Sequence, residues 1–153
     1  MDLRFDHLGV VAKSLKQGRK MMQQALLVKD WTEVYEDTLN GVVLQFGFDQ
    51  SGMCYELLEP IDQNSPVFPA LSGRKAILNH VAYRVQNLAA SASHLVAAGC
   101  APTSKPKPAV AYEGRKIQFF VTPLWFVVEL IEAWEHRHLT SILPEAAGPA
   151  ARG

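Results

Sequence analysis

The chain contains an internal repeat at an offset of 73 residues, and this repeat constrains its fold more than any other feature. With that offset His7 aligns with His80, and Glu56 aligns with Glu129. Nine of the 54 pairs between 6/79 and 59/132 are identical, and the alignment needs no gap. Because the identities fall on strong metal-ligand types and on matching glycine turn positions, we interpret the repeat as a duplication.

Each half of the chain predicts the same succession of a strand, a helix and three further strands. Residues 3–12 and 77–85 are rich in strand-forming side chains, and Ser14 and Asn87 follow them where helix N-caps are expected. Apolar residues then recur at helical spacing directly after each cap. Shorter extended runs are expected at 31–35, 42–48, 53–58, 110–112, 116–121 and 125–133.

The sequence therefore predicts an α+β fold of two tandem βαβββ modules. The first module is expected to take residues 1–61 and the second residues 77–134. Residues 62–76, which hold two prolines and a glycine, are expected to form a linker. Residues 135–153 are expected to form a flexible C-terminal tail. The two modules together make one structural domain.

Charge and hydropathy exclude several classes of function. Fifteen basic and fifteen acidic residues give a formal net charge of zero, so neither nucleic acid nor an anionic membrane is an expected partner. The apolar run 124–128 is far shorter than the ~20 residues of a spanning helix, and the charged first ten residues do not resemble a signal peptide. Cys54 and Cys100 lie in apolar surroundings, which is typical of reduced cysteines in a cytoplasmic protein, although the sequence leaves a disulfide open.

The two His–Glu pairs are the candidate functional residues. Glu56 and Glu129 each lie between apolar neighbours, so both carboxylates are expected to be buried. A buried carboxylate is costly unless it is paired, whereas two carboxylates and two neutral imidazoles balance one divalent cation. With His7 and His80 this set suits Zn, Ni, Co, Mn or Fe(II).

Other titratable repeats and histidines are expected to have ordinary roles. Glu59 and Glu132, three positions after the candidate ligands, are expected to be structural. His94 is placed on a helix and His136 and His138 in the tail, where solvent-facing roles are more common than metal ligation.

The duplicated module with His and Glu in register resembles the vicinal oxygen chelate superfamily, which includes glyoxalase I. Within it the chain is most similar to methylmalonyl-CoA epimerases and to glyoxalase I-like proteins. The resemblance covers about residues 3–134 and implies that the two modules form an open, partly closed sheet around a metal site. It rests on the stretches Phe5–Val11, Tyr55–Pro60, Asn64–Val67, Asn79–Ala82 and Val127–Leu130.

The resemblance implies that His7, Glu56, His80 and Glu129 bind a divalent metal that polarises a substrate carbonyl. Glu129 and Glu56 would be the catalytic carboxylates that move the proton of the adjacent carbon. Two features depart from the epimerases: Leu44 stands where some of them have an acidic residue, and a glycine- and lysine-containing turn before the last strand is missing.

Several functions therefore stay open. The first is an isomerase or lyase of the methylmalonyl-CoA epimerase type, and the second is a glyoxalase I-like lactoylglutathione lyase. A third, of another class, is a non-catalytic antibiotic-binding resistance module, which a complete ligand set disfavours. Ring-cleaving dioxygenases and metal–thiol transferases normally use three protein ligands, so the four candidate ligands of this chain disfavour both. The resemblance implies a small-molecule partner, such as an acyl-CoA or a thiol adduct, and a homodimer whose ligands come from one chain or from two.

Overall fold

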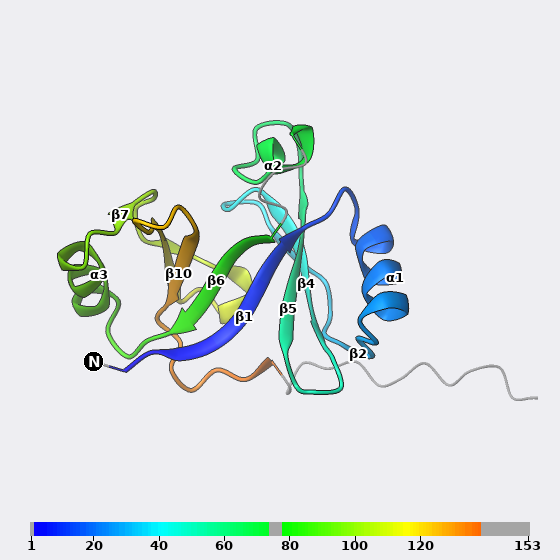
Figure 1. The fold of residues 1–153 in the computed structure, drawn as a ribbon, viewed down its shortest axis with the longest axis horizontal. Coiled ribbons are helices and arrows are strands. Elements are labelled where there is room, and N and C mark those ends of the chain that lie inside the picture. The colour runs from blue at the N-terminus through cyan, green and yellow to red at the C-terminus, as the bar shows by residue number, and fades with distance from the viewer. Residues whose placement is uncertain (1, 74–77, 139–153) are drawn as a thin grey trace, which may run out of the picture.

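The computed structural model describes residues 2–73 and 78–138. Its strands and helices occur twice in a similar order, as the repeat predicts (Figure 1). The first half contains β1 (Arg4–Val11), α1 (Leu15–Ala25), β2 (Asp30–Trp31), β3 (Tyr35–Asp37), β4 (Val42–Phe48), β5 (Cys54–Pro60) and α2 (Phe68–Ser72). The second contains β6 (Leu78–Arg84), α3 (Leu88–Ala97), β7 (Ala101–Pro102), β8 (Lys107–Pro108), the 3₁₀ helix η1 (Val110–Tyr112), β9 (Lys116–Val121) and β10 (Val127–Ile131).

The strands form one ten-stranded mixed sheet that joins the two halves at its centre. Its order is β2-β4-β5-β1-β6-β10-β9-β7, with β3 beside β4 and β8 beside β9. The first strand of each half pairs in parallel with a later strand of the same half, β1 with β5 and β6 with β10. The strands β1 and β6 pair with each other antiparallel. This arrangement is an approximate twofold about the β1–β6 pair, and it confirms the glyoxalase-like α+β fold.

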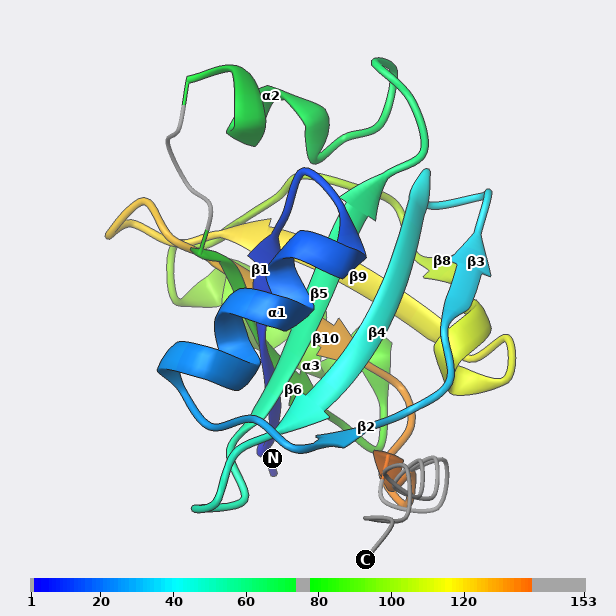
Figure 2. The same cartoon turned by 90° about the vertical axis from the view of Figure 1, so that its right-hand side faces the viewer.

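The helices α1 and α3 lie at opposite ends of the molecule, each packed against the sheet of its own half (Figures 1 and 2). Under α1 the core is formed by Leu15, Met22, Val28, Trp31 and Leu57. Under α3 it is formed by Val85, Leu88, Cys100, Phe120, Val128 and Leu130. A third buried cluster, which includes Leu44, Phe46, Leu58, Tyr112, Ile117 and Ile131, draws on both halves. The described part of the chain has no helix that is long and apolar enough to cross a membrane.

Both helices begin with the same pair of caps. Ser14 accepts a hydrogen bond from the backbone N–H of Gln17, and Asn87 does so from Ala90. A glutamate from the last strand region supplies a second acceptor in each half. Glu59 Oε2 accepts from the N–H of Leu15 at 2.7 Å, and Glu132 Oε1 accepts from that of Leu88 at 2.9 Å. These bonds satisfy helix N–H groups that have no partner within the helix, which confirms the structural role predicted for both glutamates.

Three of the predicted strands differ from those in the structure. Residues 110–112 form the 3₁₀ helix η1 rather than a strand, because Glu113 and Gly114 both have positive φ and reverse the chain there. The strand predicted over 125–133 begins only at Val127, because Trp125 lies in a turn with a φ of 67°. The strand predicted over 31–35 is divided between β2, which ends at Trp31, and β3, which begins at Tyr35. The expected linker 62–76 contains the short helix α2, which has Pro69 in its first turn, where a missing N–H costs nothing.

Both cysteines are buried and free, as predicted, and no disulfide joins them. Burial raises the pKa of the Cys54 thiol to about 12. A thiol with this pKa stays protonated at neutral pH, so Cys54 is a packing residue and not a nucleophile.

Candidate metal centre

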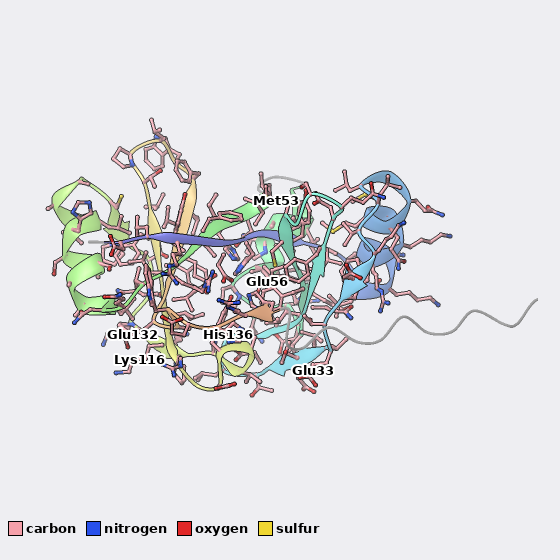
Figure 3. The ribbon with its side chains drawn as sticks, turned by 90° about the horizontal axis from the view of Figure 1, so that it is seen from below. Glu33, Met53, Glu56, Lys116, Glu132 and His136 are labelled. Carbon is pink, nitrogen blue, oxygen red and sulfur yellow. The ribbon has the colours of Figure 1, made fainter. Side chains whose placement is uncertain are left out.

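Four adjacent strands carry the four predicted ligands to one point. His7 comes from β1, Glu56 from β5, His80 from β6 and Glu129 from β10. All four are nearly or wholly buried, with exposed fractions between 0% and 6%. Seen from below, the labelled Glu56 lies near the middle of the molecule, between the two outer helices (Figure 3).

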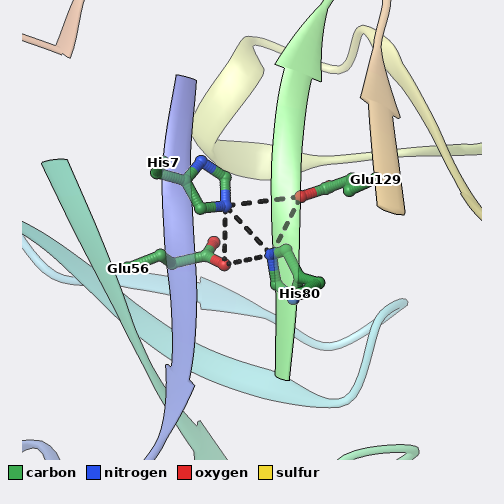
Figure 4. A group of neighbouring side chains, drawn as sticks. All are labelled: His7, Glu56, His80 and Glu129. Atoms are coloured by element: carbon green, nitrogen blue, oxygen red, sulfur yellow. Dashed lines mark hydrogen bonds and ion pairs between the residues drawn. The ribbon is translucent and has the colours of Figure 1, made fainter. Parts of the chain in front are cut away.

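The ligating atoms form a compact group of two triangles that share the edge between the two imidazole nitrogens (Figure 4). The Nε2 atoms of His7 and His80 lie 3.0 Å apart. Glu56 Oε2 lies 3.2 Å from His7 Nε2 and 3.3 Å from His80 Nε2. Glu129 Oε2 lies 3.4 Å and 3.1 Å from the same two nitrogen atoms. In this view the two carboxylates lie on either side of the line that joins the imidazole nitrogens (Figure 4).

The strand register leaves room for the imidazoles. Gly9 of β1 is paired with His80 of β6, and His7 is paired with Ala82. A β-carbon at position 9 would lie 2.5 Å from His80 Nε2 and closer still to other atoms of that ring. Glycine is therefore required at this position for the His80 ring to reach the centre.

The residue before each histidine fixes the orientation of its ring. His7 Nδ1 lies 2.8 Å from Asp6 Oδ2, and His80 Nδ1 lies 3.0 Å from Asn79 Oδ1. Both oxygens are acceptors, so each Nδ1 carries the donated proton and each Nε2 turns a lone pair toward the centre. Histidines that bind metals through Nε2 typically make this hydrogen bond from Nδ1.

The electrostatics of the centre favour a bound cation. Burial by itself would lower the pKa of His7, but the nearby Glu56 carboxylate, with Asp6 and Glu129, raises it well above its usual value. The pKa of His80 is raised by Glu129 and Glu56, which outweigh the opposing effect of burial. For Glu56, burial opposes ionisation but the two imidazoles prevail and lower its pKa to about 2. Without a metal, the carboxylates thus hold protons on the imidazoles.

The residues present fit a divalent metal ion. The four ligand atoms all lie within 4.8 Å of one another. When both Nε2 atoms carry no proton, Glu129 Oε2 is buried without a hydrogen-bond partner, which leaves its lone pairs unsatisfied. Two imidazole nitrogens and two carboxylate oxygens match the preferences of Zn, Ni, Co, Mn or Fe(II), and one such ion would accept a lone pair from each of the four ligand atoms.

A cavity of about 440 Å³ opens onto Glu56, His80 and Glu129. Its walls are largely apolar, with Leu44 and Ile117, at equivalent positions of the two halves, among them. The polar side chains around it include Asn40, Asn79, Thr103, Ser104 and Lys107. A pocket of this size and character is typical of a small-molecule site. The candidate centre thus lies at the wall of a cavity large enough for a small molecule.

One histidine that we expected to face solvent is instead buried near the centre. His138 is 6% exposed, and its Nε2 lies 2.7 Å from Asp6 Oδ2. His94 is exposed on α3 as expected, and His136 is half-buried. Residues 135–138 of the predicted flexible tail therefore lie against the body of the protein, and 139–153 are outside the described residues. Periodicity carries no signal for such a contact, because the segment after β10 is irregular.

Comparison with known families agrees with this geometry. The model of the Glyoxalase/Bleomycin resistance protein/Dioxygenase superfamily matches residues 6–119. A comparison of the sequence with curated proteins finds no significant match.

Solved structures with the same fold cover most of the chain. A hypothetical protein of Bacillus halodurans C-125 aligns with a TM-score of 0.73 and 21% identity, over 90% of this chain and 99% of its own. Methylmalonyl-CoA epimerase from Mycobacterium tuberculosis aligns with a TM-score of 0.69 and 20% identity, over 89% and 90%. A variant of Streptomyces coelicolor methylmalonyl-CoA epimerase, in complex with 2-nitronate-propionyl-CoA, gives 0.69 and 21%, over 85% and 94%. With the family model spanning most of the chain, this protein belongs to the Glyoxalase/Bleomycin resistance protein/Dioxygenase superfamily.

Proposed function

We propose that the protein is a metal-dependent isomerase or lyase that moves a proton at the carbon next to a substrate carbonyl. Its preferred substrate would be a 2-methylmalonyl thioester, as in the epimerases with the same fold. The observation that carries the proposal is the convergence of His7, Glu56, His80 and Glu129 at a largely apolar cavity. A metal bound by them would polarise the carbonyl and make the neighbouring C–H acidic.

The residues of the centre and of the cavity would have different roles in this reaction. His7 and His80 present their Nε2 atoms and hold the centre in place. Glu56 and Glu129, on opposite sides of the imidazole pair, are the proposed proton carriers (Figure 4). The apolar walls of the cavity exclude water, which strengthens the electrostatic interactions within it.

The position of the two carboxylates also bears on whether epimerisation is possible with Leu44 in place of an acidic residue. Inversion of a carbon centre requires proton removal on one face and proton return on the other. Leu44 lines the cavity and supplies no base, but Glu56 and Glu129 already reach the centre from two sides. Asp37 also lines the cavity, although its oxygens accept hydrogen bonds from Asn40 and from the N–H of Val110. We therefore assign both proton transfers to the two glutamates of the centre.

A glyoxalase I-like lyase is the second candidate. Among the described cavity residues, the only carboxylate outside the centre is that of Asp37, which is already hydrogen-bonded. A lyase would need no further carboxylate, since one ligand glutamate suffices for its proton transfer. A protein that only binds a small molecule and does not transform it would not need four buried metal ligands, so the complete set disfavours this function.

Deuterium uptake by the substrate tests the proposal. Protein loaded with Ni²⁺, Co²⁺ or Zn²⁺ is incubated in D₂O with a 2-methylmalonyl thioester or with the hemithioacetal of methylglyoxal and a thiol. We expect exchange at the carbon next to the carbonyl and, with the thioester, loss of optical activity. Binding of both compounds without exchange would contradict the proposal and favour a sequestering role.

We also propose that the protein is a homodimer, on the resemblance alone. Size-exclusion chromatography with light scattering would then give twice the 16.9 kDa of one chain.

A further inference from the structure

The carboxylate of Asp6 is the meeting point of four side chains behind the candidate centre. Its Oδ1 forms an ion pair with Arg84 Nε at 2.8 Å. Its Oδ2 lies 2.8 Å from His7 Nδ1, 2.7 Å from the hydroxyl of Tyr112 and 2.7 Å from His138 Nε2. Asp6 is only 7% exposed, so water contributes little to its solvation and these contacts determine its orientation.

His138 reaches Asp6 because the segment after β10 is fixed to the body of the protein. Its ring stacks on Phe46 with centroids 3.8 Å apart and an interplanar angle of 25°. Its Nδ1 lies 3.3 Å from His136 Nε2. Arg84 Nη1 donates to the carbonyl oxygens of Trp134 and His136. The same arginine therefore holds both Asp6 and the backbone that brings His138 to it.

The two halves of the molecule differ at this point. Asn79 takes the place of Asp6 in the second half and contacts His80 Nδ1, but it is neutral. A carboxylate is the stronger acceptor for an imidazole N–H, but it rotates unless other donors fix it. His138 Nε2 has the Asp6 carboxylate as its acceptor, and the Tyr112 hydroxyl donates to the same oxygen.

We propose that His138 is a positioning residue of the metal centre. By donating from Nε2 to Asp6, it holds the carboxylate where it accepts the Nδ1 proton of His7, and so keeps His7 Nε2 directed at the metal. The inference rests on the metal site of the proposed function, but it does not depend on the reaction. Outer-shell partners of this kind typically change metal affinity 10- to 100-fold.

The test is Co²⁺ affinity, measured by competition with a chelator, for the purified protein and three variants. His138→Ala removes the donor, whereas His138→Gln keeps an N–H at a similar reach. His94→Ala, on the exposed surface of α3, is the matched control. We expect Co²⁺ binding to weaken by about 10- to 100-fold in His138→Ala and to stay within about threefold in the other two variants.

A proton NMR spectrum of the Co²⁺-loaded protein separates positioning from packing. Two shifted N–H signals are expected, one from each ligand imidazole. In His138→Ala the His7 signal should exchange faster with water while the His80 signal is unchanged. Should His138→Ala be poorly folded by circular dichroism, Tyr112→Phe keeps the aromatic ring, removes one donor to Asp6 and should weaken Co²⁺ binding in the same direction.

Two results would overturn the inference: unchanged Co²⁺ affinity in His138→Ala, or His138→Gln as weak as His138→Ala, since the ring would then act only by packing on Phe46. These results are distinct from failure of the proposed reaction. A protein that binds Co²⁺ with the expected variant effects but exchanges no substrate proton would contradict the reaction alone.

Discussion

His7 and His80 are 73 residues apart in the sequence, yet their Nε2 atoms face each other at 3.0 Å. Each ring donates its Nδ1 proton to the preceding residue, so two nitrogen lone pairs meet between two carboxylates. Lone pairs at this distance repel unless a proton or a cation lies between them. The two Nε2 atoms therefore need a positive charge between them. Either a proton or a metal ion can supply this charge, and the two compete for the site.

This competition predicts opposite effects of pH on the metal-free and metal-loaded proteins. The pKa values of His7 and His80 are raised above their usual value of 6.5 by the carboxylates, in spite of burial. Their protonation therefore stabilises the metal-free fold below about pH 6.5, and that stabilisation is lost as the pH rises through the raised pKa values. Metal binding requires neutral imidazoles and strengthens over the same range.

Thermal unfolding between pH 6 and 9, with EDTA or with excess Zn²⁺, measures this effect. We expect the melting temperature in EDTA to fall as the pH rises, and the stabilisation by Zn²⁺ to grow. A stabilisation by Zn²⁺ that is the same at every pH would contradict protonated imidazoles in the metal-free centre.

Gly9→Ala should damage the centre without touching a proposed ligand. Because a β-carbon at this position overlaps the His80 ring, the imidazole must move away from His7. We expect metal affinity to fall at least 10-fold, and the free energy of unfolding to fall by about 1–3 kcal/mol from overpacking. Titration calorimetry with Ni²⁺ and denaturant unfolding measure the two effects.

The matched control for Gly9→Ala is the reverse change at the equivalent position of the second half, Ala82→Gly. Ala82 is buried opposite His7, so this change removes a methyl group and creates no overlap. It should cost about 0.5–1 kcal/mol of stability and leave metal binding within a few-fold. Equal Ni²⁺ affinity in both variants would show that the contact with the His80 ring does not matter.

Glu56→Gln and Glu129→Gln should each abolish epimerisation of a 2-methylmalonyl thioester. The amide keeps the shape of the side chain but accepts no proton, so one of the two faces loses its base; the expected loss is about 10²- to 10⁴-fold. Chiral analysis of the thioester and metal content are measured on the same samples. Epimerisation at the unaltered rate in either metal-loaded variant would exclude that glutamate as a proton carrier.

Glu59→Ala and Glu132→Ala should each destabilise the fold by about 1 kcal/mol, as loss of a helix cap typically does. Each removes the acceptor for the first N–H of a helix, at Leu15 or Leu88. Denaturant unfolding measures the loss, with Glu33→Ala on the exposed surface as a control that should change little (Figure 3). Equal stability of all three variants would show that the caps contribute nothing.

The repeat allowed the fold and the convergence of four residues to be predicted from the sequence. Twin modules that pair through their first strands bring symmetry-related positions together, so matched His and Glu residues converge even though no local pattern places them in contact. A structural role was also predicted for Glu59 and Glu132, although not that they would cap the two helices. Residues that are far apart in the sequence could be predicted to meet here, because the duplication makes residues 73 positions apart structurally equivalent.

Features that break the repeat were not predicted. The cluster of Asp6, Arg84, Tyr112 and His138 has no counterpart in the other half, and its members are spread over 132 positions of the chain. The short apolar run at 110–112 has the composition of a strand, but it forms a 3₁₀ helix that ends at Glu113 and Gly114, both with positive φ. Such contacts depend on tertiary packing, which hydrophobic periodicity does not report.

The X-ray absorption spectrum of protein loaded with one equivalent of Zn²⁺ tests the central claim most directly. The account predicts only nitrogen and oxygen ligands at about 2.0–2.2 Å, with the outer-shell scattering of two imidazoles that disappears stepwise in His7→Ala and His80→Ala. A spectrum of the hydrated ion, or one with sulfur ligands, would show that these four side chains do not bind the metal.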